Sequence, residues 1–152
     1  MKKERAVVDA GNILYLGRPP ERKPSIKNVF AVMSAVTESG REPIVIVDRA
    51  MFSAVGAIED VEKLLVSPGV ISIPLGSDAA RCVLDAALQY DAIVVSNNTY
   101  AEYWNEYPWI EVCRMPVALL DGSVRLLEGR FKDTTYHDIS GRRTARTLPR
   151  AG

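Results

Sequence analysis

The stretch DAIVVSNNTYAEY, residues 91–103, places four apolar side chains between an aspartate and a cluster of small polar groups. The apolar run, Ala92–Val95, predicts a short strand that is buried on both faces. Two adjacent amides, Asn97 and Asn98, stand where that strand ends. Since any polar residue would suit a solvated loop, this pair raises the question of which other groups reach the same edge of the fold.

Apolar strands and amphipathic helices alternate along most of the chain. We expect strands at residues 6–8, 43–48, 70–74, 92–96, 116–120 and 123–127, and helices at 26–39, 57–65, 78–90 and 99–105. Ser25 and Ser77 are the expected caps of the first and third of these helices. Because the strands are apolar throughout, the pattern predicts a three-layer α/β/α fold with a central, mainly parallel sheet.

The size and charge of the chain fit one soluble domain. We expect a folded domain over residues 1–130 and a mobile, basic tail over 131–152. Nineteen basic residues balance nineteen acidic ones, so the net charge does not point to a nucleic-acid partner. No apolar run approaches the roughly 20 residues of a membrane span. The N-terminus does not have the form of a secretory signal, so we expect a cytoplasmic protein without a membrane partner. Cys82 and Cys113 match no zinc spacing and are expected to be free thiols.

Acidic side chains follow several of the expected strands. Asp9 ends the first strand and Asp48 ends the second. Asp78 starts the helix after the third strand, and Glu102 lies one helical turn beyond the fourth. The carboxyl ends of parallel strands meet at one edge, where grouped carboxylates favour a bound cation. Oxygen ligands without histidine or thiolate suit Mg²⁺ or Mn²⁺. Each acid taken alone can also be explained as a turn or helix cap.

The stretches VVDAGN (7–12) and DAIVVSNNTY (91–100) together resemble the NYN branch of the PIN-like nucleases, in particular the Regnase-type ribonuclease domain. That family shows V-[VI]-D-G-x-N after its first strand and D-[GA]-I-V-V-S-N-D-x-Y around its fourth. The resemblance covers residues 6–127 and implies a PIN-like fold. It further implies an endoribonuclease that cuts single-stranded RNA with Mg²⁺ (or Mn²⁺) held by four acids.

Carried over position by position, the resemblance assigns the catalytic and metal-binding roles to Asp9, Asp78, Asn98 and Glu102. Asn12 matches the amide that supports the first acid. The family has an acid where Asn98 stands, so one charge is lost here while a neutral oxygen ligand is kept. The family's acids at the preceding helix start align with Ala79 and Ala80, and Asp78 lies just before them.

We therefore expect hydrolysis of single-stranded RNA, with a metal ion that lowers the pKa of the attacking water and stabilises the transition state. The lone His137 does not favour a histidine-driven mechanism without metal. Phosphate and base contacts are expected from Asn12, Asn97, Arg18, Arg49 and Tyr100. For the aromatic residues near Tyr100, packing on the sheet is the more common role.

The asparagine at position 98 leaves several functions open. The chain could be a slower nuclease, a nuclease with a relocated acid at Asp48 or Glu102, or a degenerate domain that binds nucleic acid or a protein without cleavage. A homo-oligomer and an inhibitory protein partner, as in toxin-like nucleases, are also compatible with the sequence. A nucleotide-binding Rossmann domain is disfavoured, because no G-x-G-x-x-G follows the first strand.

Overall fold

A five-stranded parallel sheet forms the centre of the molecule. The computed structural model describes residues 3–17, 24–128, 135–136 and 146–147. The strands of the sheet are β1 (Arg5–Asp9), β2 (Glu42–Asp48), β3 (Val70–Ile73), β4 (Ile93–Val95) and β5 (Arg114–Met115). They lie in the order β3-β2-β1-β4-β5, and every neighbouring pair is parallel. The predicted α/β fold with a mainly parallel sheet is confirmed.

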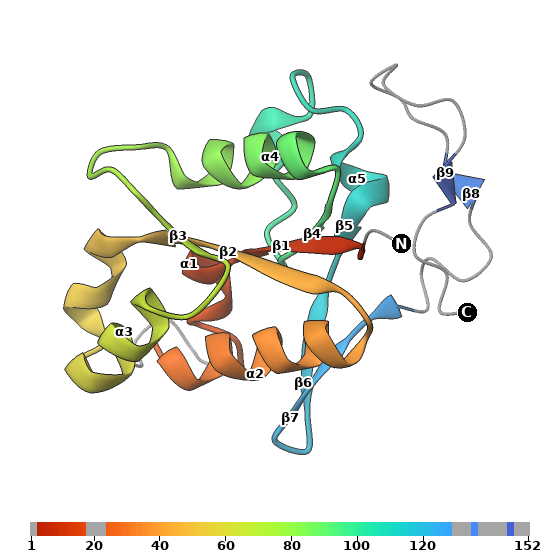
Figure 1. Ribbon diagram of the computed structural model, residues 1–152. Coiled ribbons are helices and arrows are strands. Elements are labelled where there is room, and N and C mark those ends of the chain that lie inside the picture. Colours follow the sequence, from red (N-terminus) through yellow and green to blue (C-terminus); the bar gives the residue numbers. More distant parts are fainter. Residues whose placement is uncertain (1–2, 18–23, 129–134, 137–145, 148–152) are drawn as a thin grey trace.

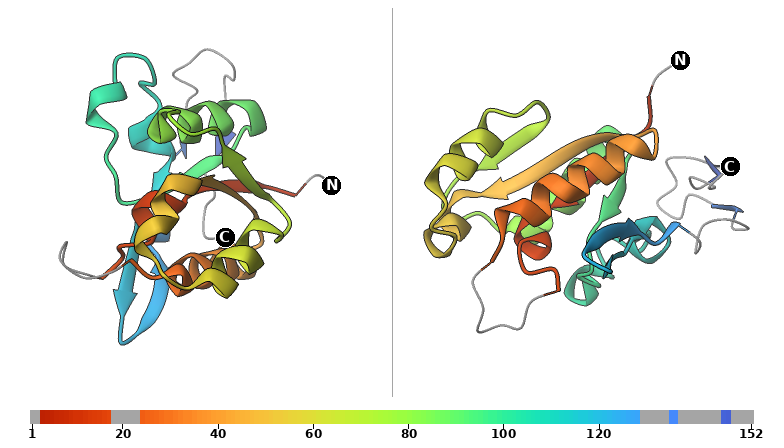
Figure 2. Two further views of the ribbon diagram at one scale, coloured as in Figure 1. Left: turned by 90° about the vertical axis from the view of Figure 1, so that its left-hand side faces the viewer. Right: turned by 90° about the horizontal axis from the view of Figure 1, so that it is seen from below.

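Helices cover both faces of the sheet, as Figure 1 shows. On one face lie α2 (Ile26–Glu38) and α3 (Ile58–Leu65), and on the other lie α4 (Ala79–Tyr90) and the short α5 (Ile110–Cys113). The left view in Figure 2 shows the same three layers from another side. Three short helical elements follow strand ends: α1 (Ala10–Ile13) after β1, η1 (Arg49–Ala54) after β2 and η2 (Ala101–Tyr103) beyond β4.

The core explains why these segments fold as they do. Residues Ala6, Val7 and Val8 of β1 are fully buried because helices cover the sheet on both sides. The apolar stripe of α2, with Val29, Val32 and Val36, is also fully buried. Each buried valine or leucine contributes roughly 1.5–3 kcal/mol relative to an exposed one. The helical spacing seen in the sequence therefore identifies the faces that hold the layers together.

The two expected strands near the C-terminal side do not join the main sheet. They form β6 (Val117–Leu120) and β7 (Ser123–Leu126), a separate antiparallel hairpin that packs against α2. Asp121 and Gly122 between them have positive φ angles of 50° and 77°. A two-residue turn of this kind joins antiparallel strands, whereas a parallel connection needs a dozen or more residues. The strand β5 was missed, because two residues are too few to show a pattern.

Two expected helix caps differ from the structure. Ser25 precedes α2 but makes no side-chain capping hydrogen bond. The cap of α4 is Asp78 and not Ser77, because the Asp78 carboxylate accepts a hydrogen bond from the backbone N–H of Arg81 at 3.1 Å. Aspartate is as good a cap as serine, so residue preference alone does not choose between the two neighbours.

The proposed tail, residues 131–152, lies largely outside the described residues. Within it the structure describes only a two-stranded antiparallel pair, β8 (Thr135–Tyr136) and β9 (Arg146–Thr147). The expected mobility of the tail and the domain boundary at residue 130 stay predictions. Both cysteines are free, as expected. No helix within the described parts of the chain combines the length and apolar character of a membrane span.

Candidate active site at the carboxyl edge of the sheet

The carboxyl ends of β1 and β4 meet at the point where the chain reverses its direction across the sheet. From β1 the chain adds β2 and then β3 on one side, and α4 returns it to β4 on the other side. Ligands of open parallel sheets bind at such a reversal, because the connections leave toward opposite faces and open a crevice. Asp9 ends β1 and Ser96 follows β4, so both lie at this edge of the sheet, which we call the crevice.

Asp9 is the central group of the crevice. Its side chain accepts hydrogen bonds from the hydroxyl of Tyr100 at 2.5 Å, the hydroxyl of Ser96 at 3.2 Å and the backbone N–H of Asn12 at 3.4 Å. It is buried, and none of the ion pairs among the described residues involves it. Burial raises the pKa of Asp9, and these three hydrogen bonds offset part of that effect.

Tyr100 is buried and cannot stack on a base, which corrects its expected role. The ring lies in the core at 2% exposure, and only the hydroxyl reaches the crevice. Burial and the Asp9 charge raise the pKa of Tyr100, so the hydroxyl keeps its proton and donates a hydrogen bond to the Asp9 carboxylate. Tyr100 therefore orients Asp9, while the aromatic segment after it mostly packs: Tyr107 and Trp109 are buried, and Trp104 is exposed.

The two amides after β4 join separate parts of the fold. The side chain of Asn97 bonds to the N–H and to the C=O of Val117, both at 2.8 Å, and so attaches the β6–β7 hairpin to the crevice. Its backbone N–H donates to the Asn12 side-chain oxygen at 2.9 Å, which links the loops after β1 and β4. Asn97 and Asn12 thus have structural roles, and their contact with a substrate stays a prediction.

Asn98 shapes the turn that leads to Tyr100. Its side-chain oxygen accepts a hydrogen bond from the backbone N–H of Tyr100 at 2.9 Å, and its own N–H donates to Ser96 Oγ at 3.0 Å. Tyr100 has a positive φ of 56°, and the Asn98 bond supports this unusual backbone conformation. The amide therefore stabilises the local turn, and a carboxylate oxygen at the same place could accept the same bond.

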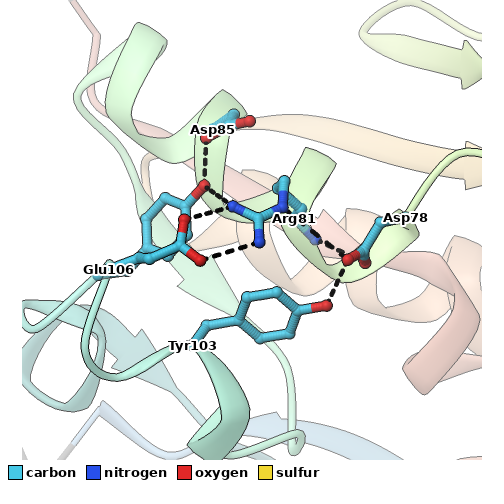
Figure 3. A network of polar contacts seen from close by, with 6 residues as sticks. Asp78, Arg81, Asp85, Tyr103 and Glu106 are labelled. Carbon is cyan, nitrogen blue, oxygen red and sulfur yellow. Dashed lines mark hydrogen bonds and ion pairs between the residues drawn. The ribbon is translucent and has the colours of Figure 1, made fainter.

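Asp78 lies in a different network, which Figure 3 shows. Its carboxylate accepts a hydrogen bond from the Tyr103 hydroxyl at 2.5 Å and lies 3.9 Å from Arg81 Nε. The Tyr103 hydroxyl and the Arg81 backbone N–H lower the pKa of Asp78. Arg81 also forms two contacts with Glu106, at 2.5 and 3.0 Å, and lies over the rings of Tyr103 and Tyr107. These contacts fasten the segment after β4 to α4.

One short turn holds both acids. We call residues Tyr100–Tyr103 the tyrosine turn: Tyr100 bonds to Asp9, and Tyr103 bonds to Asp78. The two carboxylates share no hydrogen-bond partner among the contacts described. Between the tyrosines, Glu102 is exposed. The sequence contains these tyrosines, but nothing in their spacing shows that their hydroxyls reach two acids, one at the end of β1 and one at the start of α4.

The remaining predicted residues lie around this centre. Asp48 caps η1, because its carboxylate accepts a hydrogen bond from the backbone N–H of Ala50 at 3.0 Å. Capping is a common structural role for an acid at the end of a strand. Arg49 is exposed beside it. Arg18 lies outside the described residues, so its contact with RNA stays a prediction. Ser96, Tyr103 and Arg81 were missed as site residues. Ser96 is the serine of the stretch DAIVVSNNTY but was assigned no role, and Tyr103 and Arg81 lie outside both motifs.

The donor set fits a divalent cation at Asp9 but does not form a cluster of acids. Among the described residues, no three histidine, cysteine or acidic side chains lie close enough together to hold a metal ion. Asp9 offers hard oxygen atoms without a cationic partner, which suits Mg²⁺. Asp78 already has a hydroxyl and a guanidinium beside its carboxylate. The predicted catalytic and metal-binding roles of Asp9, Asp78, Asn98 and Glu102 therefore all stay predictions.

A comparison with known protein families shows to which family this domain belongs. A family model described as the Zc3h12a-like ribonuclease NYN domain matches residues 2–149. The chain belongs to this family of RNA-cleaving nucleases. No curated protein sequence gives a significant match to this NYN domain.

Solved structures support the fold of the NYN domain. Two structures of nuclear protein-only RNase P 2 (PRORP2) from A. thaliana are similar to it, with TM-scores of 0.65 and 0.59. Sequence identities are 16% and 19%, and the matches cover 81% and 82% of this chain. They cover only 29% and 30% of the PRORP2 chains. The likeness therefore shows a shared α/β fold within a longer protein.

Proposed function

We propose that this NYN domain is an endoribonuclease that hydrolyses phosphodiester bonds in single-stranded RNA, and that it requires a divalent cation. The observation that carries the proposal is the buried carboxylate of Asp9 at the reversal point of the sheet. Burying a carboxylate without a cationic partner costs folding free energy. Perturbed acids of this kind concentrate at functional sites, which favours catalysis over a purely structural role.

Each residue of the crevice has a defined part in this proposal. Asp9 would hold Mg²⁺ (or Mn²⁺), which when bound supplies a more acidic water and neutralises charge on the phosphate. Tyr100, Ser96 and Asn12 fix the orientation of the Asp9 carboxylate through the hydrogen bonds described above. Mg²⁺ commonly keeps several waters and uses one or two carboxylates together with substrate phosphates, so a four-acid cluster is not required.

RNA contacts, location and partners complete the proposal. Arg49 is exposed next to η1 and suits a backbone phosphate. Single-stranded RNA is the proposed substrate, and the cytoplasm is the proposed location. A homo-oligomer and an inhibitory protein partner are compatible with the proposal and are not needed for it.

Cleavage of end-labelled single-stranded RNA tests the proposed activity. We expect products with Mg²⁺ or Mn²⁺, none with EDTA, and a loss of roughly 100-fold in rate for Asp9→Asn, equivalent to ~2.7 kcal/mol of transition-state stabilisation. Glu59→Gln, an exposed acid on α3, is the matched control and should cleave like the wild type. Cleavage that persists both in EDTA and in Asp9→Asn would refute the proposal.

A second candidate function is RNA binding without cleavage. Two observations favour it: no three-acid group forms among the described residues, and Asp78 is already bonded to Tyr103 and paired with Arg81. The same RNA separates the two functions. Binding by the wild type with no products in either Mg²⁺ or Mn²⁺ would establish the second candidate.

A further inference from the structure

A cavity of about 450 Å³ opens between η1 and α3, after the carboxyl end of β2. Its walls include the aromatic ring of Phe52, the aliphatic side chains of Ile58 and Val61, and the polar side chains of Arg49, Ser53 and Glu62. The volume lies within the range of roughly 300–1,000 Å³ that is usual for small-ligand sites.

The cavity lies beside the Asp9 crevice. The strand β2 pairs with β1, and Ile46 stands opposite Asp9 in the register. From η1, the Cε of Met51 lies 3.7 Å from the place that a Cβ on Gly11 would occupy, and Asp9 Oδ1 is equally close to that place. The first turn after β2 therefore lies close to the loop that carries Asp9, and a strand of RNA bound at Asp9 would pass close to the cavity.

The side chains of the cavity suit one unit of a nucleic acid. Phe52 is half-buried, so its position is fixed while part of its surface stays open. Ile58 is 72% exposed, which is unusual for a large apolar side chain at a cavity rim. Arg49 makes none of the ion pairs among the described residues and is open to a phosphate. Glu62 can accept a hydrogen bond from a base N–H.

A second, larger cavity is less suited to binding RNA. It has about 560 Å³, and its walls include Phe30, Met33 and Pro43. It lies at the amino end of β2, the opposite edge from Asp9. The charged side chains that line it, Glu38 and Glu42, are both acidic and repel a phosphate backbone. Position and charge therefore single out the cavity beside η1.

We propose that the cavity between η1 and α3 is a nucleobase subsite that receives one base of the RNA strand engaged at Asp9. Phe52 stacks on the base, and Arg49 contacts the adjoining phosphate. The proposal rests on the proposed function, because it places the base relative to an RNA bound at the crevice. It assigns the ligand class to a splayed base of single-stranded RNA, in keeping with stacking on aromatic side chains.

Fluorescence anisotropy with the full chain in EDTA tests the subsite without cleavage. The probes are a short labelled oligocytidylate and the same ribose-phosphate chain without bases. The measured quantity is the ratio of the two affinities, which isolates base contacts from phosphate contacts. Phe52→Ala removes the stacking ring, and Ser53→Trp fills the cavity from an exposed position. Val66→Ala, at an 82% exposed position at the end of the same helix, is the matched control.

We expect the wild type and Val66→Ala to share one ratio, and Phe52→Ala and Ser53→Trp to lower it by roughly tenfold, as one lost stacking contact would. Circular dichroism confirms that both variants are folded. If both variants keep the wild-type ratio, the subsite is refuted while the proposed function stands. If the wild type binds the oligocytidylate neither in EDTA nor with Mg²⁺, the proposed function fails, and the subsite fails with it.

Discussion

At the scale of single residues, the site depends on the burial and the hydrogen-bond partners of each polar side chain. Asp9 is buried and its pKa is raised by burial, whereas Asp78 is exposed and its pKa is lowered by the Tyr103 hydroxyl. Two aspartates that each come directly before a helix thus have pKa values shifted in opposite directions. Both carboxylates cap a helix, so the difference arises from the burial of Asp9 and from the hydrogen-bond partners of Asp78.

Asp9→Asn should stabilise the fold at neutral pH while it removes activity. A carboxyl with a raised pKa contributes stability below its unfolded pKa and loses that contribution as the pH rises through its folded pKa. We expect a gain of the order of 1 kcal/mol at pH 7 that shrinks toward zero in acid. Urea unfolding at neutral and acidic pH measures it. A variant less stable than the wild type at pH 7 would contradict this account.

Asn98→Asp should restore the acid that the family carries at this position. The Asn98 oxygen that accepts the Tyr100 N–H has an equivalent in aspartate, so the turn is retained. With an additional carboxylate near Asp9, we expect Mg²⁺-dependent cleavage to rise by roughly tenfold or more, equivalent to ~1.4 kcal/mol. Asn105→Asp, an exposed position on the same segment, is the control. An unchanged cleavage rate would show that the missing carboxylate at position 98 does not limit the activity.

At the scale of elements, side chains connect pieces that the main sheet does not join. The hairpin β6–β7 belongs to no strand pair of the main sheet, and the Asn97 side chain links it to the end of β4. The tyrosine turn likewise links β1 and α4 through Asp9 and Asp78. Elements that carry the site are therefore held by polar side chains as well as by core packing.

Asn97→Ala should loosen the hairpin. It removes two hydrogen bonds to Val117 and leaves a part-buried N–H and C=O without these partners. We expect a loss of about 2 kcal/mol in the free energy of unfolding. Chemical denaturation measures this loss, and Asn105→Ala serves as the exposed control with no expected effect. Equal stabilities of the two variants would show that Asn97 does not hold the hairpin.

Tyr103→Phe should raise the pKa of Asp78 toward its ordinary value, because the Tyr103 hydroxyl is the main cause of its lowering. A lowered pKa contributes stability above the unfolded pKa that is lost as the pH falls through the folded pKa. Since Asp78 is exposed, the cost at neutral pH should stay below about 1 kcal/mol. An NMR titration of the Asp78 carboxyl measures the shift. Tyr15→Phe is the control, and an unmoved Asp78 would contradict the assigned bond.

At the scale of the whole molecule, Arg41 joins segments that are far apart in the chain. Its side chain is 4% exposed, lies 2.8 Å from Glu128 beyond β7, and also reaches Ser39 at the end of α2. A weaker contact at 3.9 Å leads to Glu4 before β1. One guanidinium therefore ties the first strand, the long helix and the hairpin at the edge opposite the site.

Glu128→Gln should destabilise the whole domain, because it leaves a buried guanidinium without its closest carboxylate. We expect a loss of about 2–3 kcal/mol that changes little with salt, since buried pairs are weakly screened. Thermal unfolding at low and high ionic strength measures both features. Glu38→Gln, an exposed acid outside the ion pairs described, is the control. A small, strongly salt-dependent loss would indicate a surface pair instead.

The sequence alone determined the layers of this NYN domain, because helix and strand periods report burial directly. The apolar runs of β1, β2 and β4 predict a parallel sheet, and VVDAGN with DAIVVSNNTY indicates the family. The sequence also identified Asp9 as a candidate site residue, because the carboxyl ends of parallel strands lie at one edge of the sheet. These features depend on local sequence pattern and on the order of strands and helices along the chain, and both can be predicted from the sequence.

Only the tertiary structure decided how the polar groups are paired. The Tyr100 and Tyr103 hydroxyls reach two acids that are 91 and 25 residues away in the chain. The amide of Asn97 bonds to Val117 of the hairpin, and the cavity beside Phe52 needs η1 and α3 to pack together. Hydrogen bonds act over about 3 Å and depend on direction, so they form only after the backbone has brought distant segments together.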